Sequence, residues 1–235
     1  MAVGIHGTSE SIGQSHTLSC VRCSHRLTAP AAALALSLVP AGCGGHPAGA
    51  PARINQFDGA AYPAGVRAPD FTLRNQLGRN VSLRAFREQV VVLSFVSTDC
   101  RACVLVAQQI RGALDELASA PTYGRGTVVP AMQTLLVSTD PRTDTRERVG
   151  RFLAETSLTD RVSYLTGTET QLLPVWRAYR VTPRGAGKQA SEAATTVLLI
   201  GRTGAERDAF GLEQLTPEGL AHDIRLLRDG RPTAG

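Results

Sequence analysis

The feature that most constrains this fold is an apolar run that leads directly into a pair of cysteines. Residues 90–96, VVVLSFV, are apolar apart from one serine, which predicts a central β-strand covered on both faces. The chain continues STDCRAC, and apolar residues then recur at helical spacing through residues 101–118. The pattern therefore predicts a strand, a short turn and a helix, with Cys100 and Cys103 where the helix begins.

The same alternation of strand and helix extends to the end of the chain. Upstream, FTLRNQLGRNVSL predicts a hairpin around residues 75–78. The downstream elements, in chain order, are a strand at QTLLVST, a helix at DTRERVGRFLAET, a short edge strand at VSYLTG, a helix at TETQLLPVWRAYR, strands at TTVLLI and AERDAF around a GRTG turn, and a helix at TPEGLAHDIRLLR.

Three of these helices carry terminal or breaking signals. Asp144 is the expected N-cap of the second helix, with Glu147 as its capping-box partner. Pro174 is expected to kink or break the third helix. Thr216 is the expected N-cap of the last helix, with Pro217 at its first position.

Two strand–helix units, a hairpin and a closing helix predict a thioredoxin-like α/β fold with an N-terminal β-hairpin extension. A flavodoxin-like sheet also alternates, but it does not predict a CxxC pair at the first strand-to-helix junction. The formal net charge is +5, with acidic and basic residues interspersed. Because no basic stripe with aromatic residues is present, the sequence does not indicate a nucleic-acid surface.

The first part of the chain has the pattern of a bacterial export signal. Residues 27–42 form an uncharged run that is shorter than the roughly 20 residues of a membrane span. The run ends in VPAGCGG, which resembles a lipobox and predicts lipidation at Cys43; plain secretion and an uncleaved apolar anchor are the alternatives. We therefore expect a lipoprotein-type signal region at 1–42, a flexible linker at 43–65, and a domain at 66–230 that is lipid-anchored to the extracytoplasmic face of a bacterial cell membrane.

This processing leaves one cysteine pair in the domain. Of the five cysteines, Cys20 and Cys23 would leave with the signal region and Cys43 would carry lipid. The CVRC sequence formed by Cys20 and Cys23 lacks the second ligand pair that a structural zinc site needs. Cys100 and Cys103 are then the expected thiols of the mature fold.

The position of Cys100 suits thiol chemistry. The N-terminus of a helix offers free amides and the positive end of the helix dipole, both of which favour a thiolate. Cys100 is therefore the expected nucleophile, and Cys103, one turn later, the expected resolving thiol. Arg101 should lower the thiol pKa, whereas Asp99 should oppose this unless it caps the helix. A permanent disulfide or two reduced core cysteines are the structural alternatives.

Four segments together resemble the Sco/SenC family over residues 66–228. VVVLSFVSTDCRAC resembles its active-site strand and turn, and LLVSTDPRTDTRE is similar to its SVDPERDTPE segment. YLTGTETQLLPVWRAYRV and VLLIGRTG resemble the helix and hairpin that follow. The resemblance implies a thioredoxin-fold copper chaperone or thiol reductase of cytochrome c oxidase assembly, with copper as a possible cofactor.

The chain departs from this family pattern at the implied copper site. The family spacing is CxxxC, and a family histidine that completes a two-cysteine, one-histidine site is replaced by Ala193. His46, in the linker, and His222, on the last helix, are not persuasive substitutes. Cys100 and Cys103 could still hold Cu(I) through two thiolates.

A second comparison separates the chain from ordinary thioredoxins. Thr195 stands roughly where thioredoxins and TlpA/ResA-like proteins place a cis-proline that contacts substrate. Residues 180–194 are expected to form a loop near the cysteines, where they either control partner access or are a tolerated surface insertion.

These observations favour a membrane-tethered thiol-disulfide oxidoreductase in which Cys100 attacks and Cys103 resolves. Its expected partner is a cysteine-containing protein, with a subunit of cytochrome c oxidase implied by the resemblance. No cofactor is required for this chemistry. Three alternatives stay open: a Cu(I) metallochaperone that uses the same pair, a peroxiredoxin-like peroxidase that uses Ser97 and Cys100, and a redox-inert scaffold.

Overall fold

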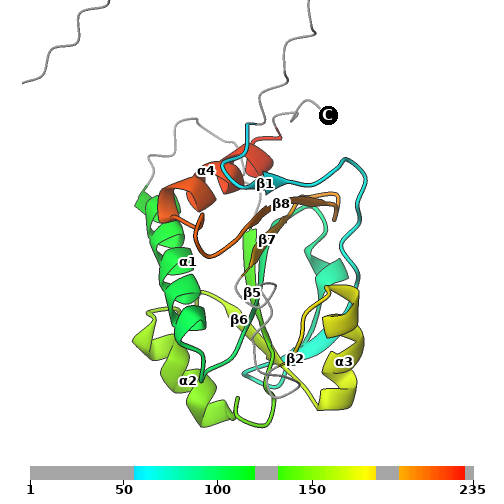
Figure 1. Cartoon of the computed structure of the whole chain (residues 1–235), viewed down its shortest axis with the longest axis vertical. Coiled ribbons are helices and arrows are strands. Elements are labelled where there is room, and N and C mark those ends of the chain that lie inside the picture. The colour runs from blue at the N-terminus through cyan, green and yellow to red at the C-terminus, as the bar shows by residue number, and fades with distance from the viewer. Residues whose placement is uncertain (1–55, 120–131, 184–195, 231–235) are drawn as a thin grey trace, which may run out of the picture. The chain divides into compact units, whose positions relative to one another are not determined.

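The predicted central strand lies in the middle of an eight-stranded sheet (Figure 1). The structure, a computed structural model, describes residues 56–119, 132–183 and 196–230. The strands, in sheet order, are β1 (Ala60–Ala61), β8 (Glu206–Phe210), β7 (Val197–Ile200), β4 (Val90–Val96), β5 (Met132–Ser138), β6 (Ser163–Thr166), β2 (Thr72–Asn75) and β3 (Asn80–Ser82).

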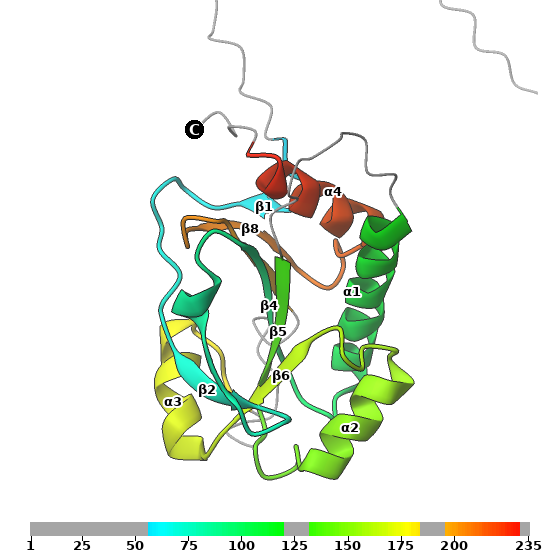
Figure 2. The same ribbon diagram turned by 180° about the vertical axis from the view of Figure 1, so that it is seen from behind.

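The helices divide between the two faces of the sheet (Figures 1 and 2). They are α1 (Arg101–Ser119), α2 (Arg146–Glu155), α3 (Glu169–Ala178) and α4 (Pro217–Arg228), with a short 3-10 turn at Leu83–Phe86. One apolar core joins α1, α2 and α4 to the sheet, and a second joins α3 and the β2–β3 hairpin to the other face. Because both faces of β4 are covered, all seven of its residues are buried.

The strand order confirms the thioredoxin-like α/β fold with its N-terminal hairpin. In the core, β4 pairs in parallel with β5 and antiparallel with β7, which pairs antiparallel with β8. The hairpin attaches through β2 to the outer side of β6. The serine within the apolar run is also accounted for, because the Ser94 hydroxyl donates to the Thr196 carbonyl at 3.0 Å.

The hairpin turn forms where the sequence predicts it. The side-chain oxygen of Asn75 accepts hydrogen bonds from the backbone N–H groups of Leu77 and Arg79, at 3.0 and 2.9 Å. Gly78 has a φ of 77°, a left-handed conformation that glycine adopts without steric cost. The turn chemistry is therefore local, which explains why the sequence reveals it.

The prediction for the strand before the third helix is wrong, and the third helix is not broken. β6 is not an edge strand, because β2 pairs with the side that β5 leaves open. Pro174 does not break α3, which runs from Glu169 to Ala178. Pro174 and Thr170, whose carbonyl loses its helical donor, are both exposed, so water can bind that carbonyl.

Core packing and strand pairing in the described residues begin before the predicted boundary at residue 66. Phe57 is buried in the core beneath α4, and Ala60 and Ala61 pair with β8. The predicted flexible linker at 43–65 is therefore wrong for this segment. Residues 1–55, including Cys43 and His46, lie outside the described part of the chain, as do Ala193 and Thr195. Among the described residues, no helix is both long and apolar enough to cross a membrane.

Candidate active site

Cys100 occupies the cap position at the start of α1. β4 ends at Val96, a short turn follows, and α1 begins at Arg101. The Cys100 carbonyl accepts the first helical hydrogen bond from the Val104 N–H at 3.2 Å, and its Sγ accepts from the Cys103 N–H at 3.1 Å. A sulfur in this position receives an amide donor and the positive end of the helix dipole, and both stabilise a thiolate.

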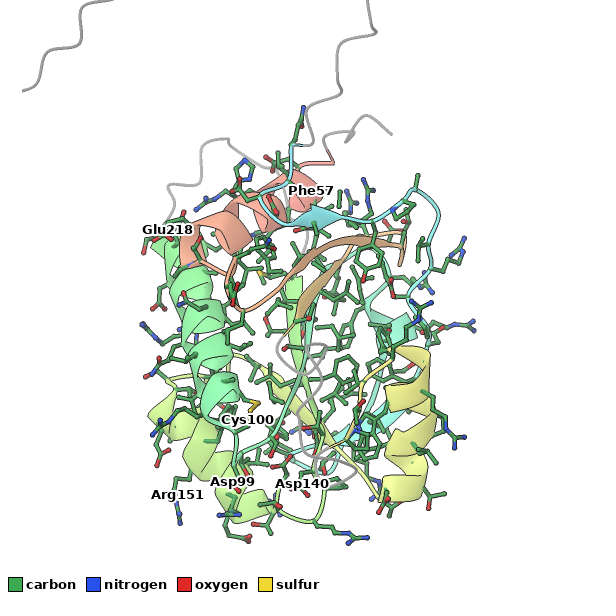
Figure 3. The ribbon with its side chains drawn as sticks, in the orientation of Figure 1. Phe57, Asp99, Cys100, Asp140, Arg151 and Glu218 are labelled. Atoms are coloured by element: carbon green, nitrogen blue, oxygen red, sulfur yellow. A yellow bond between two sulfur atoms is a disulfide. The ribbon has the colours of Figure 1, made fainter. Side chains whose placement is uncertain are left out.

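The two cysteines form a disulfide at the start of α1 (Figure 3), and they differ in access to solvent. Cys100 is 7% exposed and Cys103 only 1%. A partner molecule can therefore reach Cys100 more readily, whereas Cys103 lies on the buried face of α1, within the apolar core. This asymmetry matches the predicted order of attack and resolution, and it is equally compatible with a structural crosslink.

The charges beside Cys100 are solvated. Asp99 and Arg101 are both exposed. The Asp99 backbone N–H donates to the Ser97 hydroxyl at 3.4 Å, but among the described residues its carboxylate has no hydrogen-bond or ion-pair partner. Because Cys100 itself holds the cap position, Asp99 does not cap α1. The negative charge of Asp99 and the positive charge of Arg101 therefore act on Cys100 in opposite directions, and water screens both of them.

Asp144 supports the turn that carries the cysteines. It is 4% exposed and accepts four hydrogen bonds. One carboxylate oxygen accepts from the Thr98 N–H and hydroxyl, both at 2.8 Å. The other accepts from the Ser138 hydroxyl at 2.6 Å and the Tyr164 hydroxyl at 2.7 Å. Asp144 thus ties together the turn after β4, the end of β5 and strand β6.

The predicted capping role of Asp144 is therefore wrong. Thr145 is the N-cap of α2, since its side chain accepts from the Arg148 N–H at 3.3 Å. A hydrogen bond from its own backbone N–H, followed by one from the Thr145 side chain, lowers the Glu147 pKa. The sequence signal for Asp144 was the segment STDPRTDTRE, but a pattern of residues does not show that its second aspartate turns inward.

The side chains around Asp144 are themselves buried in the core. Tyr164 is completely buried, and burial together with the Asp144 carboxylate raises its pKa well above the usual value, so it stays a hydrogen-bond donor. Trp176 of α3 donates its indole N–H to the Ser138 carbonyl at 2.9 Å from the other face of the sheet. Both helical layers therefore hold the strand ends behind Cys100.

The described residues supply no third metal ligand beside the cysteines. Within 56–119, 132–183 and 196–230, no histidine, aspartate or glutamate joins Cys100 and Cys103 in a group that could hold a metal ion. His222 lies on α4, and α4 lies at the opposite end of the sheet from Cys100 (Figures 1 and 3), so His222 is not the missing ligand. Two thiolates fit a soft ion such as Cu(I), which accepts low coordination.

Comparisons with known proteins agree on family and fold. The SCO1/SenC family model matches residues 60–228. A search of curated proteins finds no match.

Several solved structures share the fold. Yeast Sco1 with copper bound is 20% identical with a TM-score of 0.57, and the match covers 72% of this chain and 92% of that one. BsSco, described as a member of the Sco family of cytochrome c oxidase assembly proteins with a disulfide switch, is 19% identical with a TM-score of 0.55, covering 71% and 96%. A SCO1/SenC family lipoprotein from Bacillus anthracis is 18% identical with a TM-score of 0.52, covering 70% and 96%.

Proposed function

The chain belongs to the SCO1/SenC family, and we propose that it is a membrane-tethered, extracytoplasmic thiol-disulfide oxidoreductase that exchanges electrons with cysteines of a partner protein. The observation that carries this proposal is the asymmetric pair at the start of α1. Cys100 is the more exposed of the two, at 7%, and its sulfur receives an amide donor, while Cys103 is 1% exposed and is disulfide-bonded to it.

In the reducing direction, the Cys100 thiolate attacks one sulfur of a partner disulfide. A mixed disulfide forms, and the other partner sulfur leaves as a thiolate. The Cys103 thiol then loses its proton and attacks the Cys100 sulfur, which forms the Cys100–Cys103 disulfide and releases the second partner sulfur. Two electrons pass to the partner, which takes up two protons, and the reverse sequence oxidises a partner dithiol.

The proposed location and partner rest on sequence and on relatives. Lipidation at Cys43 would anchor the domain to the extracytoplasmic face of a bacterial membrane, and the Bacillus anthracis relative is described as a lipoprotein. BsSco is described as belonging to a family of cytochrome c oxidase assembly proteins. We therefore propose a cysteine-containing oxidase subunit as the partner, during assembly of its copper site.

The second candidate is a Cu(I) metallochaperone that binds copper through the same two sulfurs. A yeast relative holds copper in its solved structure. When bound, copper would accept two thiolates from Cys100 and Cys103 and no third ligand from the described residues. We therefore expect weak Cu(I) binding and a reversible dithiol couple.

The test uses the full chain with Cys20, Cys23 and Cys43 replaced by serine, so that every remaining thiol belongs to the domain. The disulfide is equilibrated in glutathione buffers, and the reduced protein is titrated anaerobically with Cu(I) against a competing chelator. A reversible couple with copper lost to the competitor supports the oxidoreductase. Stoichiometric copper that survives the competitor, with no exchangeable disulfide, overturns it in favour of the metallochaperone.

Single-cysteine variants test the assigned roles. In the same background, Cys103→Ser should form a mixed disulfide with oxidised glutathione through Cys100, detected by mass. Cys100→Ser should react much more slowly, because Cys103 is 1% exposed. Equal rates would contradict the roles, and peroxide consumption that depends on Cys100 would favour a peroxidase instead.

A further inference from the structure

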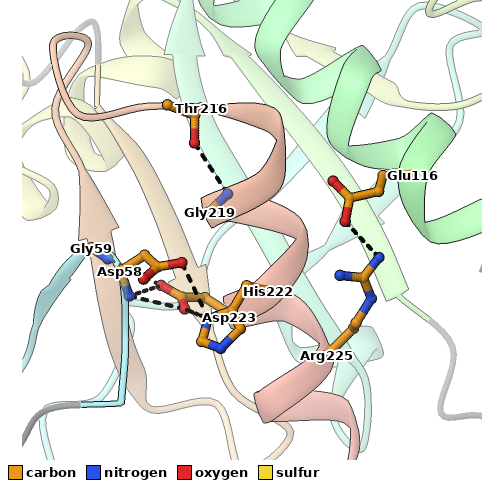
Figure 4. Close-up of polar contacts among 8 residues, drawn as sticks. All are labelled: Asp58, Gly59, Glu116, Thr216, Gly219, His222, Asp223 and Arg225. Carbon is orange, nitrogen blue, oxygen red and sulfur yellow. Dashed lines mark hydrogen bonds and ion pairs between the residues drawn. The ribbon is translucent and has the colours of Figure 1, made fainter.

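A second group of reactive side chains lies at the end of the sheet opposite the cysteines. It consists of Asp58, Asp208, His222 and Asp223, which we call the Asp/His cluster (Figure 4 shows three of its members). Asp58 precedes β1, Asp208 lies on β8, and His222 and Asp223 lie on α4. Segments far apart in the sequence therefore bring three carboxyl groups and an imidazole together.

The donor atoms of this cluster have the spacing of ligands around one metal ion. His222 Nδ1 lies 2.8 Å from an Asp223 oxygen and 3.3 Å from an Asp58 oxygen. One ligand atom from each of the three residues lies within 4.8 Å of the others. Nitrogen and oxygen atoms bound to zinc at about 2.0 to 2.2 Å lie about 2.8 to 3.6 Å apart at angles of roughly 90 to 110°.

The backbone holds Asp223 in place. Its two carboxylate oxygens accept hydrogen bonds from the Asp58 N–H at 3.0 Å, and one also accepts from the Gly59 N–H at 3.1 Å. Asp223 is completely buried, whereas the His222 side chain is 47% exposed. The cluster thus has a fixed floor and an open side through which an ion can enter.

The environment of Asp208 is a second, independent indication that a cation is missing from the cluster. It is 0% exposed, and neither of its carboxylate oxygens has a hydrogen-bond partner among the described residues. The carboxylate lies directly under Gly59, where an added Cβ would come within 2.5 Å of both oxygens. A buried carboxyl group without donors is costly unless a proton or a cation satisfies it.

We propose that the Asp/His cluster binds a divalent transition-metal ion of the zinc class. His222 Nδ1 and carboxylate oxygens of Asp58 and Asp223 are the ligands, and Asp208 supplies the buried negative charge beneath them. One imidazole with carboxylates is a donor set that suits such ions, whereas the cysteine end suits a soft monovalent ion. The bound ion would fasten the segment before β1 to α4, and this site is independent of the proposed redox function.

The test is calorimetric titration of the full chain with Zn²⁺ alone, compared with its thermal unfolding with and without Zn²⁺. Free thiols are first alkylated with iodoacetamide under non-reducing conditions, so that the Cys100–Cys103 disulfide stays intact and no thiolate competes for zinc. We expect one ion per chain and a higher Tm.

Two variants and one control assign the binding to the cluster. His222→Ala, at an exposed side chain, should fold normally and weaken zinc binding by about tenfold or more. Asp208→Asn should also weaken it while leaving the metal-free protein folded. Asp229→Asn, at an exposed aspartate that ends the same helix, should bind zinc as the unmodified chain does.

Absence of zinc-dependent heat and of a Tm rise would overturn the proposal. Equal affinity in His222→Ala and the unmodified chain would overturn it as well, because the ion would then be bound elsewhere.

Discussion

Two buried aspartates at opposite ends of the sheet have very different hydrogen-bond environments. Asp144, behind the cysteines, is 4% exposed and accepts four hydrogen bonds. Asp208, beneath α4, is 0% exposed; its carboxyl group lies against that of Asp223, and neither of its oxygens has a hydrogen-bond partner of normal geometry among the described residues. Burial alone therefore does not define the role of a carboxylate; the donors around it do.

The contrast separates a structural support from a candidate binding site. At Asp144, every carboxylate lone pair has an assigned donor, so the turn before Cys100 is fixed from behind. At Asp208, the same chemical group raises the free energy of the folded state unless something binds it. The same substitution, aspartate to asparagine, should therefore have opposite effects at the two positions.

The largest effect is expected from Asp144→Asn. An amide offers one carbonyl oxygen where the carboxylate offers two, so two of the four donors lose an acceptor inside the core. We expect the free energy of unfolding to fall by about 3 kcal/mol. Urea unfolding of the oxidised protein measures this, and a loss below about 0.5 kcal/mol would show that the network contributes little.

Asp208→Asn should instead stabilise the metal-free protein, and more so at high pH. The pKa of Asp208 is raised from 3.8 to about 8 in the folded state. The stability gained from its protonation is therefore complete below about pH 4 and is lost as the pH rises through about 8. The charged groups that act on it are Asp223 and Asp58, and both are acidic.

In EDTA, the unmodified chain should lose stability between pH 5 and pH 8.5 relative to Asp208→Asn. The gap between the two proteins should reach about 1 to 2 kcal/mol at pH 8.5. Chemical unfolding at both pH values measures this gap. If the variant is the less stable protein at pH 8.5, Asp208 is stabilised as an anion and the contrast with Asp144 fails.

Removing a single donor from Asp144 should have a smaller effect. Tyr164→Phe deletes one of the four hydrogen bonds and should cost about 1.5 kcal/mol. Tyr179→Phe is the matched control, since the Tyr179 hydroxyl donates to the Pro69 carbonyl at 2.7 Å on the other face of the sheet. Only Tyr164→Phe should shift the disulfide potential measured in glutathione buffers; equal shifts would show that the effect is not specific to the Asp144 network.

The smallest effect is expected at the neighbouring residue, Thr145. Thr145→Ala removes the N-cap of α2 and should cost about 1 kcal/mol. The disulfide potential should stay unchanged, because the hydrogen bonds of Thr145 go to Thr143, Glu147, Arg148 and Val149 and not to the turn that carries Cys100. A potential shift as large as that of Asp144→Asn would mean that α2 as a whole, rather than Asp144, positions the cysteines.

The sequence by itself determined the features that depend on near neighbours. The apolar run at 90–96, the Asn75 turn and the Thr216 cap were all predicted and found. The placement of Cys100 and Cys103 at the start of α1 belongs to the same group. Each depends on residue periodicity or on hydrogen bonds that span a few residues, which can be interpreted without knowing the rest of the fold.

Only the tertiary structure decided what the buried charges do. Asp144 reaches Thr98 across 46 residues, and Asp223 reaches the Asp58 N–H across 165. The strands β1 and β6 likewise acquired neighbours that no local pattern specifies. The physical reason is that a carboxylate has the same local propensities whether it caps a helix, faces water or accepts hydrogen bonds in the core. In the folded chain, residues distant in the sequence place hydrogen-bond donors around the Asp144 carboxylate and place none around the oxygens of Asp208.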